Sequence, residues 1–523
     1  MKKGFTLIEL LGVIVVLGII SLITTPQIIN QIRNIRDEIS SDTLRLIYSA
    51  TNRFIDENRN TYPKIEDREY CIPLVTIINS GMLPNPLIDP FSNREIDENK
   101  EVHVMVNAIY DIEFLLVEQG ACGYIDPSGA PKPYLIDNMI PVEYDFSESV
   151  WVKADVNSDW FNYAEKRWAN AVLLTPSSRG FYQNVSPGEI IDFDDVLGQF
   201  VWIPRYRYRI LNSQFDDISD SNPAFDIIFE GVSTEKSEGS SNNEWITHPA
   251  FTFGTEELDG FWVGKYTTGY SGANSVAASQ VSTPEINSAI VKPNSYAWRG
   301  ISLSNAHIVA TDMTEPGNIY GLLNSQVLSR LTRNVDWGAV AYLSRSIYGF
   351  EEQVWQNRNQ NYLTGCASDS VIGSSTSVCR QYNTENGQKA STTGNVYGVY
   401  DMSGGAHEYV MGGTYTSGNS TVRLSSSGFT TAINNSDFEP FIDKYNYNTD
   451  VNNYSHSKLG DALGETIAWD DALRVAARGN SSSSWYIRGG RNSTNPGAGI
   501  FAFSATSGGP INSVGFRLLL HEK

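Results

Sequence analysis

The N-terminal segment constrains this chain most, because it combines a long apolar run with a single acidic side chain. Residues 10–23 carry no charge and are almost all apolar, and Glu9 stands directly before them. The stretch from Phe5 to Thr25 is about long enough to span the roughly 30 Å hydrocarbon core of a bilayer as a helix. A carboxylate in that core costs roughly 2.5 to 3.5 kcal/mol, so we expect Glu9 to have a partner that neutralises it. The natural partner is the N-terminal amine of a neighbouring chain.

The residues around this acid resemble a known processing signal. The leader of type IV prepilins and of type II secretion pseudopilins is similar to the run Lys2-Lys3-Gly4-Phe5-Thr6-Leu7-Ile8-Glu9. The resemblance implies cleavage after Gly4 by a prepilin peptidase, N-methylation of Phe5, and assembly with other pilin subunits through a helix that carries Glu9. An ordinary secretory signal is the alternative, but it would have a small-residue cleavage site after the apolar run, where residues 21–26 make a poor one.

Beyond Pro26 the sequence pattern changes several times. Isoleucines at positions 28, 32, 35 and 39 recur at helical spacing, so we expect one helix to continue to about residue 58. Residues 102–106 alternate as a strand does, and the prolines of residues 126–133 are typical of a stiff linker. The division that we predict is a leader at 1–4, a transmembrane and assembly helix at 5–58, a pilin-like head at 59–127, a linker at 128–145, an accessory lobe at 146–248 and a large domain at 249–523.

The four cysteines suggest disulfides in an exported protein. Cys71, Cys122, Cys366 and Cys379 form no Cys-x-x-Cys motif, so neither a zinc ribbon nor a thioredoxin-type site is indicated. The economical pairing joins Cys71 with Cys122 and Cys366 with Cys379. Free buried thiols are the alternative, because the sequence shows no partner geometry.

Four blocks of the large domain stand out in the sequence: Gly260 to Tyr266, the stretch through Trp337 and Ala341, Gly398 to Tyr409, and Arg488-Gly489-Gly490 with Gly515-Phe516-Arg517. In this order they resemble the sulfatase-modifying-factor family, to which the formylglycine-generating enzyme belongs. The resemblance covers about residues 249–520 and implies a variant of the C-type lectin fold. The expected fold class is α+β: a long N-terminal helix with a small pilin-like antiparallel-sheet head, followed by a large, irregular C-type-lectin-like α+β domain.

The chemistry of that family is not expected in this chain. Its oxidase members bind copper through a pair of cysteines near the C-terminal motif, and no cysteine follows Cys379 here. We therefore expect no enzyme and no catalytic residue, and we interpret the motif as structural: its glycines permit unusual backbone conformations, and its arginines pair with its acids. A catalytic role for His407 and Glu408 is the alternative. The residues of this motif are Asp401, Gly404, Gly405, Glu408, Arg488, Gly489, Gly490 and Arg517.

Charge and side-chain chemistry limit the ligands. The chain has 38 Lys and Arg against 59 Asp and Glu, a net charge of −21, and nonspecific nucleic-acid binding depends on basic side chains, so no nucleic-acid partner is expected. No cofactor is expected, and metal ligands stay unknown. Calcium is a candidate only at Asn446, Asn448, Asp450 and Asn452, whose oxygen donors alternate but lack the glycine and final glutamate of an EF-hand. Turn chemistry is the alternative there.

Together these features predict a minor or tip subunit of a type IV pilin-like filament with a large, non-catalytic, adhesive head for an external glycan or protein. Lys2 and Lys3 favour a cytoplasmic start, which predicts a single-pass protein of the cytoplasmic membrane with its C-terminus outside, and later a cell-surface filament. Two alternatives stay open. One is a pseudopilin of a type II-like secretion or competence system, and the other is a filament-tethered enzyme of the formylglycine-generating-enzyme superfamily.

Overall fold

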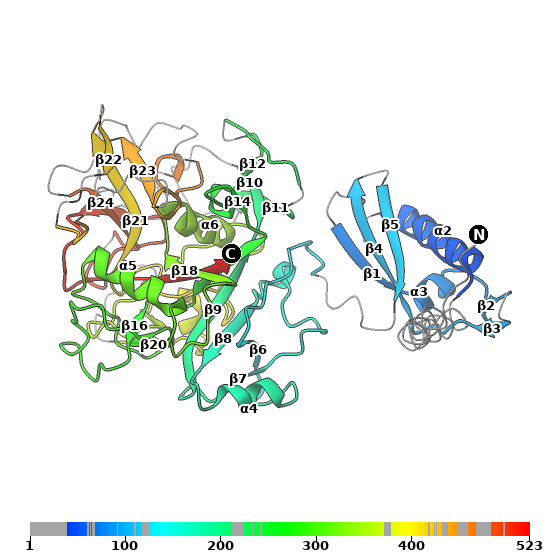
Figure 1. Cartoon of the computed structure of the whole chain (residues 1–523), viewed down its shortest axis with the longest axis horizontal. Coiled ribbons are helices and arrows are strands. Elements are labelled where there is room, and N and C mark those ends of the chain that lie inside the picture. Colours follow the sequence, from blue (N-terminus) through cyan, green and yellow to red (C-terminus); the bar gives the residue numbers. More distant parts are fainter. Residues whose placement is uncertain are drawn as a thin grey trace, which may run out of the picture. The chain divides into compact units, whose positions relative to one another are not determined.

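The chain forms two compact units, residues 1–122 and 123–523, each with its own hydrophobic core (Figure 1). No helix in the described part of the chain is long and apolar enough to cross a bilayer. The predicted transmembrane stretch, residues 5–25, lies outside that part. The computed structural model describes residues 39–59, 62, 64, 68–90, 93–108, 111–117, 126–211, 224–232, 234–240, 243–370, 378–416, 419–422, 424, 426–430, 438–446, 459–466, 483–494 and 497–523.

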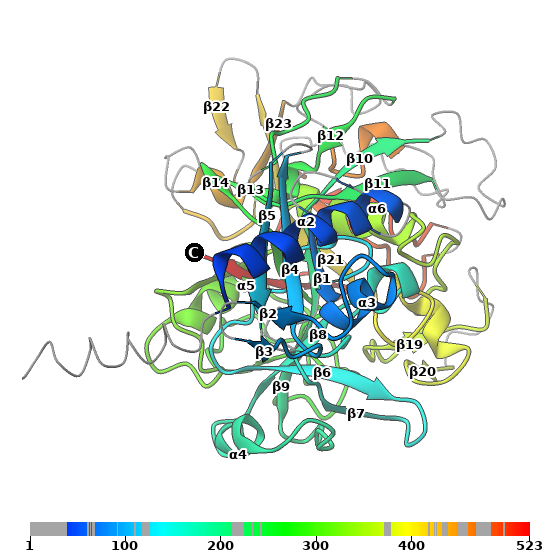
Figure 2. The same ribbon diagram turned by 90° about the vertical axis from the view of Figure 1, so that its right-hand side faces the viewer.

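In the first unit a helix packs on one face of a three-stranded antiparallel sheet. Its elements are α2 (Ser41–Glu57), β1 (Arg68–Pro73), α3 (Leu74–Asn79), β2 (Ile88–Asp89), β3 (Arg94–Glu95), β4 (Glu101–Ala108) and β5 (Asp111–Val117). The sheet order is β1-β4-β5, and Figure 2 shows α2 crossing these strands. The predicted alternation is present in β4, where Val102, Val104 and Val106 are buried in one core with Ile47 and Phe54 of α2.

The second unit is built around a seven-stranded sheet. Its strands are β6 (Met139–Asp145), β7 (Val150–Lys153), β8 (Asn170–Leu174), β9 (Val196–Pro204), β15 (Gly260–Gly264), β18 (Val327–Leu331) and β27 (Leu518–Glu522). The order is β18-β27-β15-β9-β8-β6-β7. The last of these strands in the sequence, β27, lies inside the sheet and pairs antiparallel with both β15 and β18. Every residue of β8 and of β15 is buried, which agrees with their largely apolar sequences.

The described part of this unit also contains a second sheet, three α-helices and several short strands. The sheet order is β22-β21-β24-β25, and β23 and β26 add parallel pairings to β21. Its strands are β21 (His407–Thr416), β22 (Asn419–Val422), β23 (Asp443–Asn446), β24 (Trp485–Arg488), β25 (Phe503–Thr506) and β26 (Val514–Phe516), and the helices are α4 (Arg179–Asn184), α5 (Leu303–Thr311) and α6 (Asn334–Ser344). The short strands are β10 (Tyr206–Ile210), β11 (Phe225–Phe229), β12 (Ile246–Thr247), β13 (Thr252–Phe253), β14 (Glu256–Glu257), β16 (Gly269–Tyr270), β17 (Ala289–Ile290), β19 (Cys366–Ala367) and β20 (Arg380–Gln381).

The described fold is mixed and strand-rich with few helices, so the α+β prediction is confirmed at that level. The predicted linker and accessory lobe differ from the structure, because β6 to β9 lie within residues 128–248 and are hydrogen-bonded into the same sheet as β15 and β27. The proline-rich segment also has a role in this unit: the indole of Trp202 donates to the Pro131 carbonyl at 3.2 Å, and that of Trp262 donates to the Tyr134 carbonyl at 2.7 Å. Its carbonyls satisfy buried donors, which proline content alone does not reveal.

Residues 459–466 pack tightly against α6. A Cβ on Gly338 would lie 1.9 Å from the carbonyl oxygen of Gly460, so only glycine permits this approach of the two backbones. The carboxylate of Glu465 accepts hydrogen bonds from the hydroxyls of Tyr342 and of Tyr208, the latter at 2.8 Å. Burial raises the pKa of Glu465 to about 7.

Candidate functional site

The predicted residues are spread between described and undescribed parts of the chain. The processing and assembly residues Gly4, Phe5 and Glu9 lie outside the described residues, as do three of the four members of the calcium candidate, positions 448, 450 and 452. Within the described residues, no group of three or more His, Cys, Asp or Glu is placed to hold a metal ion. The remaining candidates belong to the second unit, apart from Cys71 and Cys122.

The predicted charge pairing occurs between Arg517 and Glu408. Glu408 lies on β21, and Arg517 lies between β26 and β27. Arg517 Nε donates to Glu408 Oε2 at 2.8 Å, and Nη2 donates to Oε1 at 2.6 Å, with side-chain exposures of 1% and 0%. A bidentate pair of this kind is strong and directional, so it fixes the segment before β27 against β21.

The remaining hydrogen bonds of this pair connect it to β15 and to the block Gly398 to Tyr409. Arg517 also donates to the carbonyls of Gly264 at 2.7 Å and Tyr400 at 2.8 Å, and the Thr267 hydroxyl donates to Glu408. Three of the four blocks that carry the family resemblance therefore meet at one buried guanidinium. Its hydrogen bonds hold these blocks together in the core.

Asp401 and the glycines shape the turn before β21. Asp401 accepts hydrogen bonds from the Asn357 amide at 2.9 Å and from the Gly365 backbone at 3.0 Å, and burial raises its pKa to about 6. Gly404 has φ +81°, and a Cβ there would lie 2.3 Å from the Asn357 carbonyl oxygen, so a side chain is excluded on both counts. Gly405, Gly489 and Gly490 also have positive φ angles.

Arg488 connects two parts of the core. The sequence predicts that it pairs with Glu408 or Asp401, and it faces Glu408 as a register neighbour of β24 on β21. The bonds described for its guanidinium run to the carbonyls of Asp461 and Ala462, both at 3.0 Å, and to the side-chain oxygen of Asn334 at 3.3 Å. Arg488 thus ties residues 459–466 to the sheet.

The alternative catalytic pair, His407 and Glu408, does not form one site. Neighbouring residues of a strand project to opposite faces, so the two side chains face different surroundings. Burial, with the charge of Arg491, lowers the pKa of His407 to about 4, which leaves its imidazole neutral near neutral pH. The Glu408 carboxylate is held by Arg517 and Thr267.

Lys265 forms a further buried polar centre that the sequence reasoning did not single out. Its Nζ donates to Asn170 Oδ1 at 2.8 Å and to the carbonyls of Val396 at 2.6 Å and Gly398 at 2.9 Å. It also lies 5.0 Å from the ring centre of Trp151. Burial lowers the pKa of this amine well below its usual value. One sequence signal was available, since Lys265 is the only charged residue between Gly260 and Tyr266.

The cysteines of the second unit are joined. Cys366 and Cys379 form a disulfide with Cα atoms 4.8 Å apart, as predicted. Cys71 is also disulfide-bonded, whereas Cys122, its predicted partner, lies outside the described residues. Neither cysteine of the second unit is therefore a free thiol.

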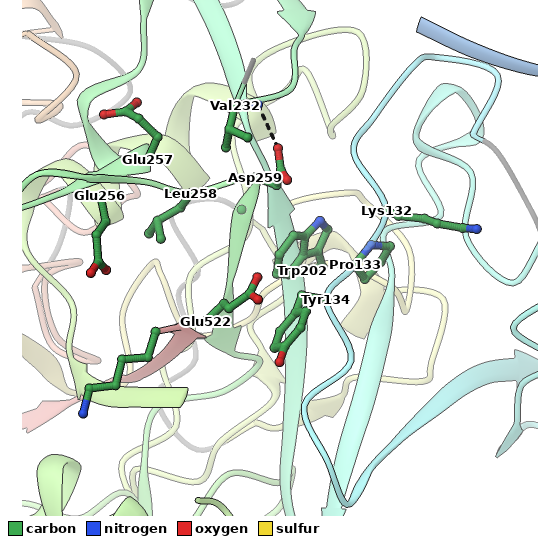
Figure 3. Close-up of a pocket in the computed structure, with 12 residues that line it drawn as sticks. Lys132, Pro133, Tyr134, Trp202, Val232, Glu256, Glu257, Leu258, Asp259 and Glu522 are labelled. Carbon is green, nitrogen blue, oxygen red and sulfur yellow. Dashed lines mark hydrogen bonds between the residues drawn. The ribbon is translucent and has the colours of Figure 1, made fainter. Parts of the chain in front are cut away.

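A cavity of about 570 Å³ opens near the ends of three adjacent strands of the seven-stranded sheet, β9, β15 and β27 (Figure 3). Trp202 and Tyr134 give it aromatic walls. Gly260 permits this packing, because a Cβ there would lie 2.4 Å from the Trp202 ring. The other lining residues are Lys132, Pro133, Val232, Glu256, Glu257, Leu258, Asp259, Glu522 and Lys523.

The charges of this cavity are unevenly arranged. The carboxylates of Asp259 and Glu522 lie on the side of the aromatic walls in Figure 3, whereas the ammonium of Lys132 points away from them. Burial and the charge of Asp259 both raise the pKa of Glu522. Glu257, by contrast, already pairs with Arg205 at 2.8 Å and with a lysine at 2.5 Å. The aromatic side of the cavity therefore also carries negative charge, from the exposed residues Asp259 and Glu522.

Comparison with known proteins identifies the start of the chain. Residues 1–25 match the family described as the prokaryotic N-terminal methylation motif. This is a prepilin-type start, as the sequence predicted. No curated protein matches the chain closely enough to count as a relative.

Two solved structures are similar to parts of the chain. Treponema denticola variable protein 1 is 12% identical, with 62% of this chain and 95% of that chain covered and a TM-score of 0.24. The Major Tropism Determinant U1 Variant is 11% identical, with 73% and 94% covered and a TM-score of 0.25. At these scores neither structure bears on the fold or the function of this chain.

Proposed function

We propose that this protein is a minor or tip subunit of a type IV pilin-like filament that displays a large, non-catalytic, ligand-binding head outside the cell. The observation that carries the proposal is the N-terminal methylation motif at residues 1–25, followed by a second compact unit at residues 123–523. The motif marks a pilin-like or pseudopilin subunit, which prepilin peptidase processes and which assembles with other pilin subunits. It also implies a membrane-anchored precursor and a surface-assembled product.

The size of the second unit favours a position that needs few copies. A unit much larger than the preceding one would crowd a filament shaft in which every subunit repeats along a helix. At a tip or a rare position, the same bulk is available for contact with an external glycan or protein. The 11 tryptophans and 27 tyrosines of the chain suit such contacts, although most of the tryptophans belong to the core.

Several features support a non-catalytic head with a C-type-lectin-like fold of the sulfatase-modifying-factor type. The first resemblance block forms β15, which pairs with β27, the strand directly after the last block. Arg517 of the last block pairs with Glu408 of the block Gly398 to Tyr409. Copper chemistry of that family would need free thiolates near the C-terminal motif. The two cysteines of this unit instead form a disulfide, and no cysteine follows Cys379.

The filament role is tested by the mature N-terminus. Mass spectrometry of the protein from cells with a prepilin peptidase should give a chain that begins with N-methylated Phe5. Glu9→Ala should be processed but depleted from sheared filaments, because the neighbouring amine loses its partner. Asp42→Asn, a change on the exposed part of α2, is the control and should enter filaments normally. An uncleaved chain, or cleavage after residue 23, would contradict the proposal.

The head's role is tested with the purified full chain in non-ionic detergent on an array of glycans and matrix proteins, with calcium and with a chelator. Saturable binding to one ligand class supports an adhesive head. Binding only to a co-exported protein of the same cell favours the alternative, a pseudopilin of a type II-like secretion or competence system. Turnover of any array ligand would favour a filament-tethered enzyme.

A further inference from the structure

We infer that the cavity near the ends of β9, β15 and β27 binds an organic cation through its ammonium or guanidinium group. The inference rests on the proposed function, because it names the ligand chemistry of a head exposed outside the cell. It is built from the shape of the cavity, the direction of its charges and the rigidity of its walls.

The shape suits a side chain or a small molecule. A volume of about 570 Å³ lies within the range of small-ligand sites, which is roughly 300 to 1,000 Å³. Trp202 and Tyr134 present aromatic surface to it, and Pro133 and Leu258 add apolar contacts. Aromatic rings attract cations through their electron-rich faces, and an apolar wall accommodates the methylene stem that carries the charge.

The charges select a cation over a neutral or anionic ligand. The Glu522 carboxylate has no hydrogen-bond or ion-pair partner among the described residues, and it feels the negative charge of Asp259. A cation between them would relieve this repulsion, whereas a neutral sugar hydroxyl would not. The lysines that line the cavity do not place an ammonium group between these two carboxylates. Lys132 points away in Figure 3, and Lys523 Nζ donates to the Asn324 carbonyl at 2.9 Å.

The walls are fixed before any ligand arrives. The Trp202 indole donates to the Pro131 carbonyl at 3.2 Å, and the Tyr134 carbonyl accepts from the Trp262 indole at 2.7 Å. The Asp259 carboxylate accepts from the Val232 amide at 2.9 Å. Groups held in this way lose little freedom on binding, which favours affinity.

The basic group has two sources, a lysine or arginine of a protein ligand and a free polyamine. The test uses the full chain in non-ionic detergent and ligand-observed saturation-transfer NMR. The probes are Nα-acetyl-lysine methylamide, its uncharged counterpart Nα-acetyl-norleucine methylamide, spermidine, and the neutral sugars glucose and galactose. The lysine derivative should bind at least about fivefold more tightly than the norleucine derivative, and added salt should weaken its binding. Spermidine binding without lysine binding would assign the cavity to free polyamines.

Substitutions of the lining residues test whether the amine binds in this cavity. Glu522→Gln and Asp259→Asn should each weaken lysine binding about two- to fivefold, and together about tenfold, whereas the exposed Glu148→Gln should leave it unchanged. Asparagine keeps the oxygen that accepts from Val232, and an unchanged tryptophan emission spectrum would show that the fold is intact. Tyr134→Leu should lower affinity by a similar factor, because the ring is lost and the apolar contact is kept.

Three results would overturn the inference. They are equal binding of the lysine and norleucine derivatives, binding that the double variant leaves unchanged, and a blank for every amine. Sugar binding in place of amine binding would overturn it as well. If the array still shows a saturable ligand while every amine is blank, only the cavity assignment fails. If the array is also blank, the proposed function of the head fails with it.

Discussion

Replacement of Arg517 by methionine should destabilise the second unit strongly, because it leaves a buried carboxylate without its cation. Arg517 makes two hydrogen bonds to Glu408 and one each to the carbonyls of Gly264 and Tyr400. Methionine fills much of the same volume but donates nothing. The Glu408 side chain, 0% exposed, would keep only the Thr267 hydroxyl among its described side-chain donors.

The expected loss in the free energy of unfolding follows from these hydrogen bonds and charges. Removal of one partner of a buried, hydrogen-bonded ion pair costs about 3 to 5 kcal/mol, because the other charge stays buried and uncompensated. Removal of both charges leaves no uncompensated charge in the core. The double change, Arg517→Met with Glu408→Leu, should therefore destabilise the unit by about 1 to 3 kcal/mol less than the sum of the two single changes.

Urea unfolding followed by tryptophan fluorescence measures this cost selectively. All 11 tryptophans lie at or beyond residue 151, so the signal reports the second unit and not the first. Arg380→Met is the matched control, since Arg380 pairs with Asp369 at 2.9 Å but both side chains are about half exposed, at 47% and 49%. Exposed pairs of this kind contribute about 0 to 1 kcal/mol.

Two outcomes would refute the reasoning. If Arg517→Met and Arg380→Met lowered the free energy of unfolding equally, burial would not control the strength of the pair. If the double variant cost as much as the two single changes added together, Arg517 and Glu408 would not act as a unit. Either result would also remove the main support for a structural reading of the motif.

Two further predictions concern the packing of residues 459–466 on α6. Because the folded pKa of Glu465 is raised to about 7 from an ordinary 4.5, its contribution to stability is complete below about pH 4.5 and is lost as pH rises through 7. Urea midpoints measured across this window should fall with pH in the natural protein, and less so in Glu465→Gln. Gly338→Ala should cost about 1 to 3 kcal/mol, because the added methyl meets the Gly460 carbonyl at 1.9 Å. Gly180→Ala in α4, with open space around it, should instead stabilise by up to about 1 kcal/mol in thermal unfolding, and a loss of stability there would contradict the steric explanation.

Local patterns in the sequence predicted local features well. The alternation of residues 102–106 predicted a half-buried strand, and β4 is one. Opposite charges in short, glycine-rich motifs predicted a buried pair, and Arg517 with Glu408 forms it. The N-terminal motif predicted a prepilin-type start, which the match to residues 1–25 supports. In each case the feature is determined by a few neighbouring residues, or by charged residues that need an opposite charge or a hydrogen-bond partner when they are buried.

The remaining features depend on contacts between distant parts of the chain. The predicted boundary at residue 249 falls between β9 and β15, yet these strands pair directly, from Gly260 with Pro204 to Gly264 with Phe200. Sequence periodicity shows that a strand exists but not which strand it joins. Arg488 illustrates the same limit, because its carbonyl partners in residues 459–466 carry no side-chain signal. The residues that line the cavity likewise come from five separate stretches of the chain.

The position of β27 has a consequence for the order of events during synthesis and export. This strand is the last of its sheet to be made, yet it lies between β15 and β18 and hydrogen-bonds to both. Until residues 518–522 have left the ribosome, β15 and β18 each keep an unpaired edge, and the sheet is incomplete. The second unit therefore completes its folding only after synthesis has passed this point.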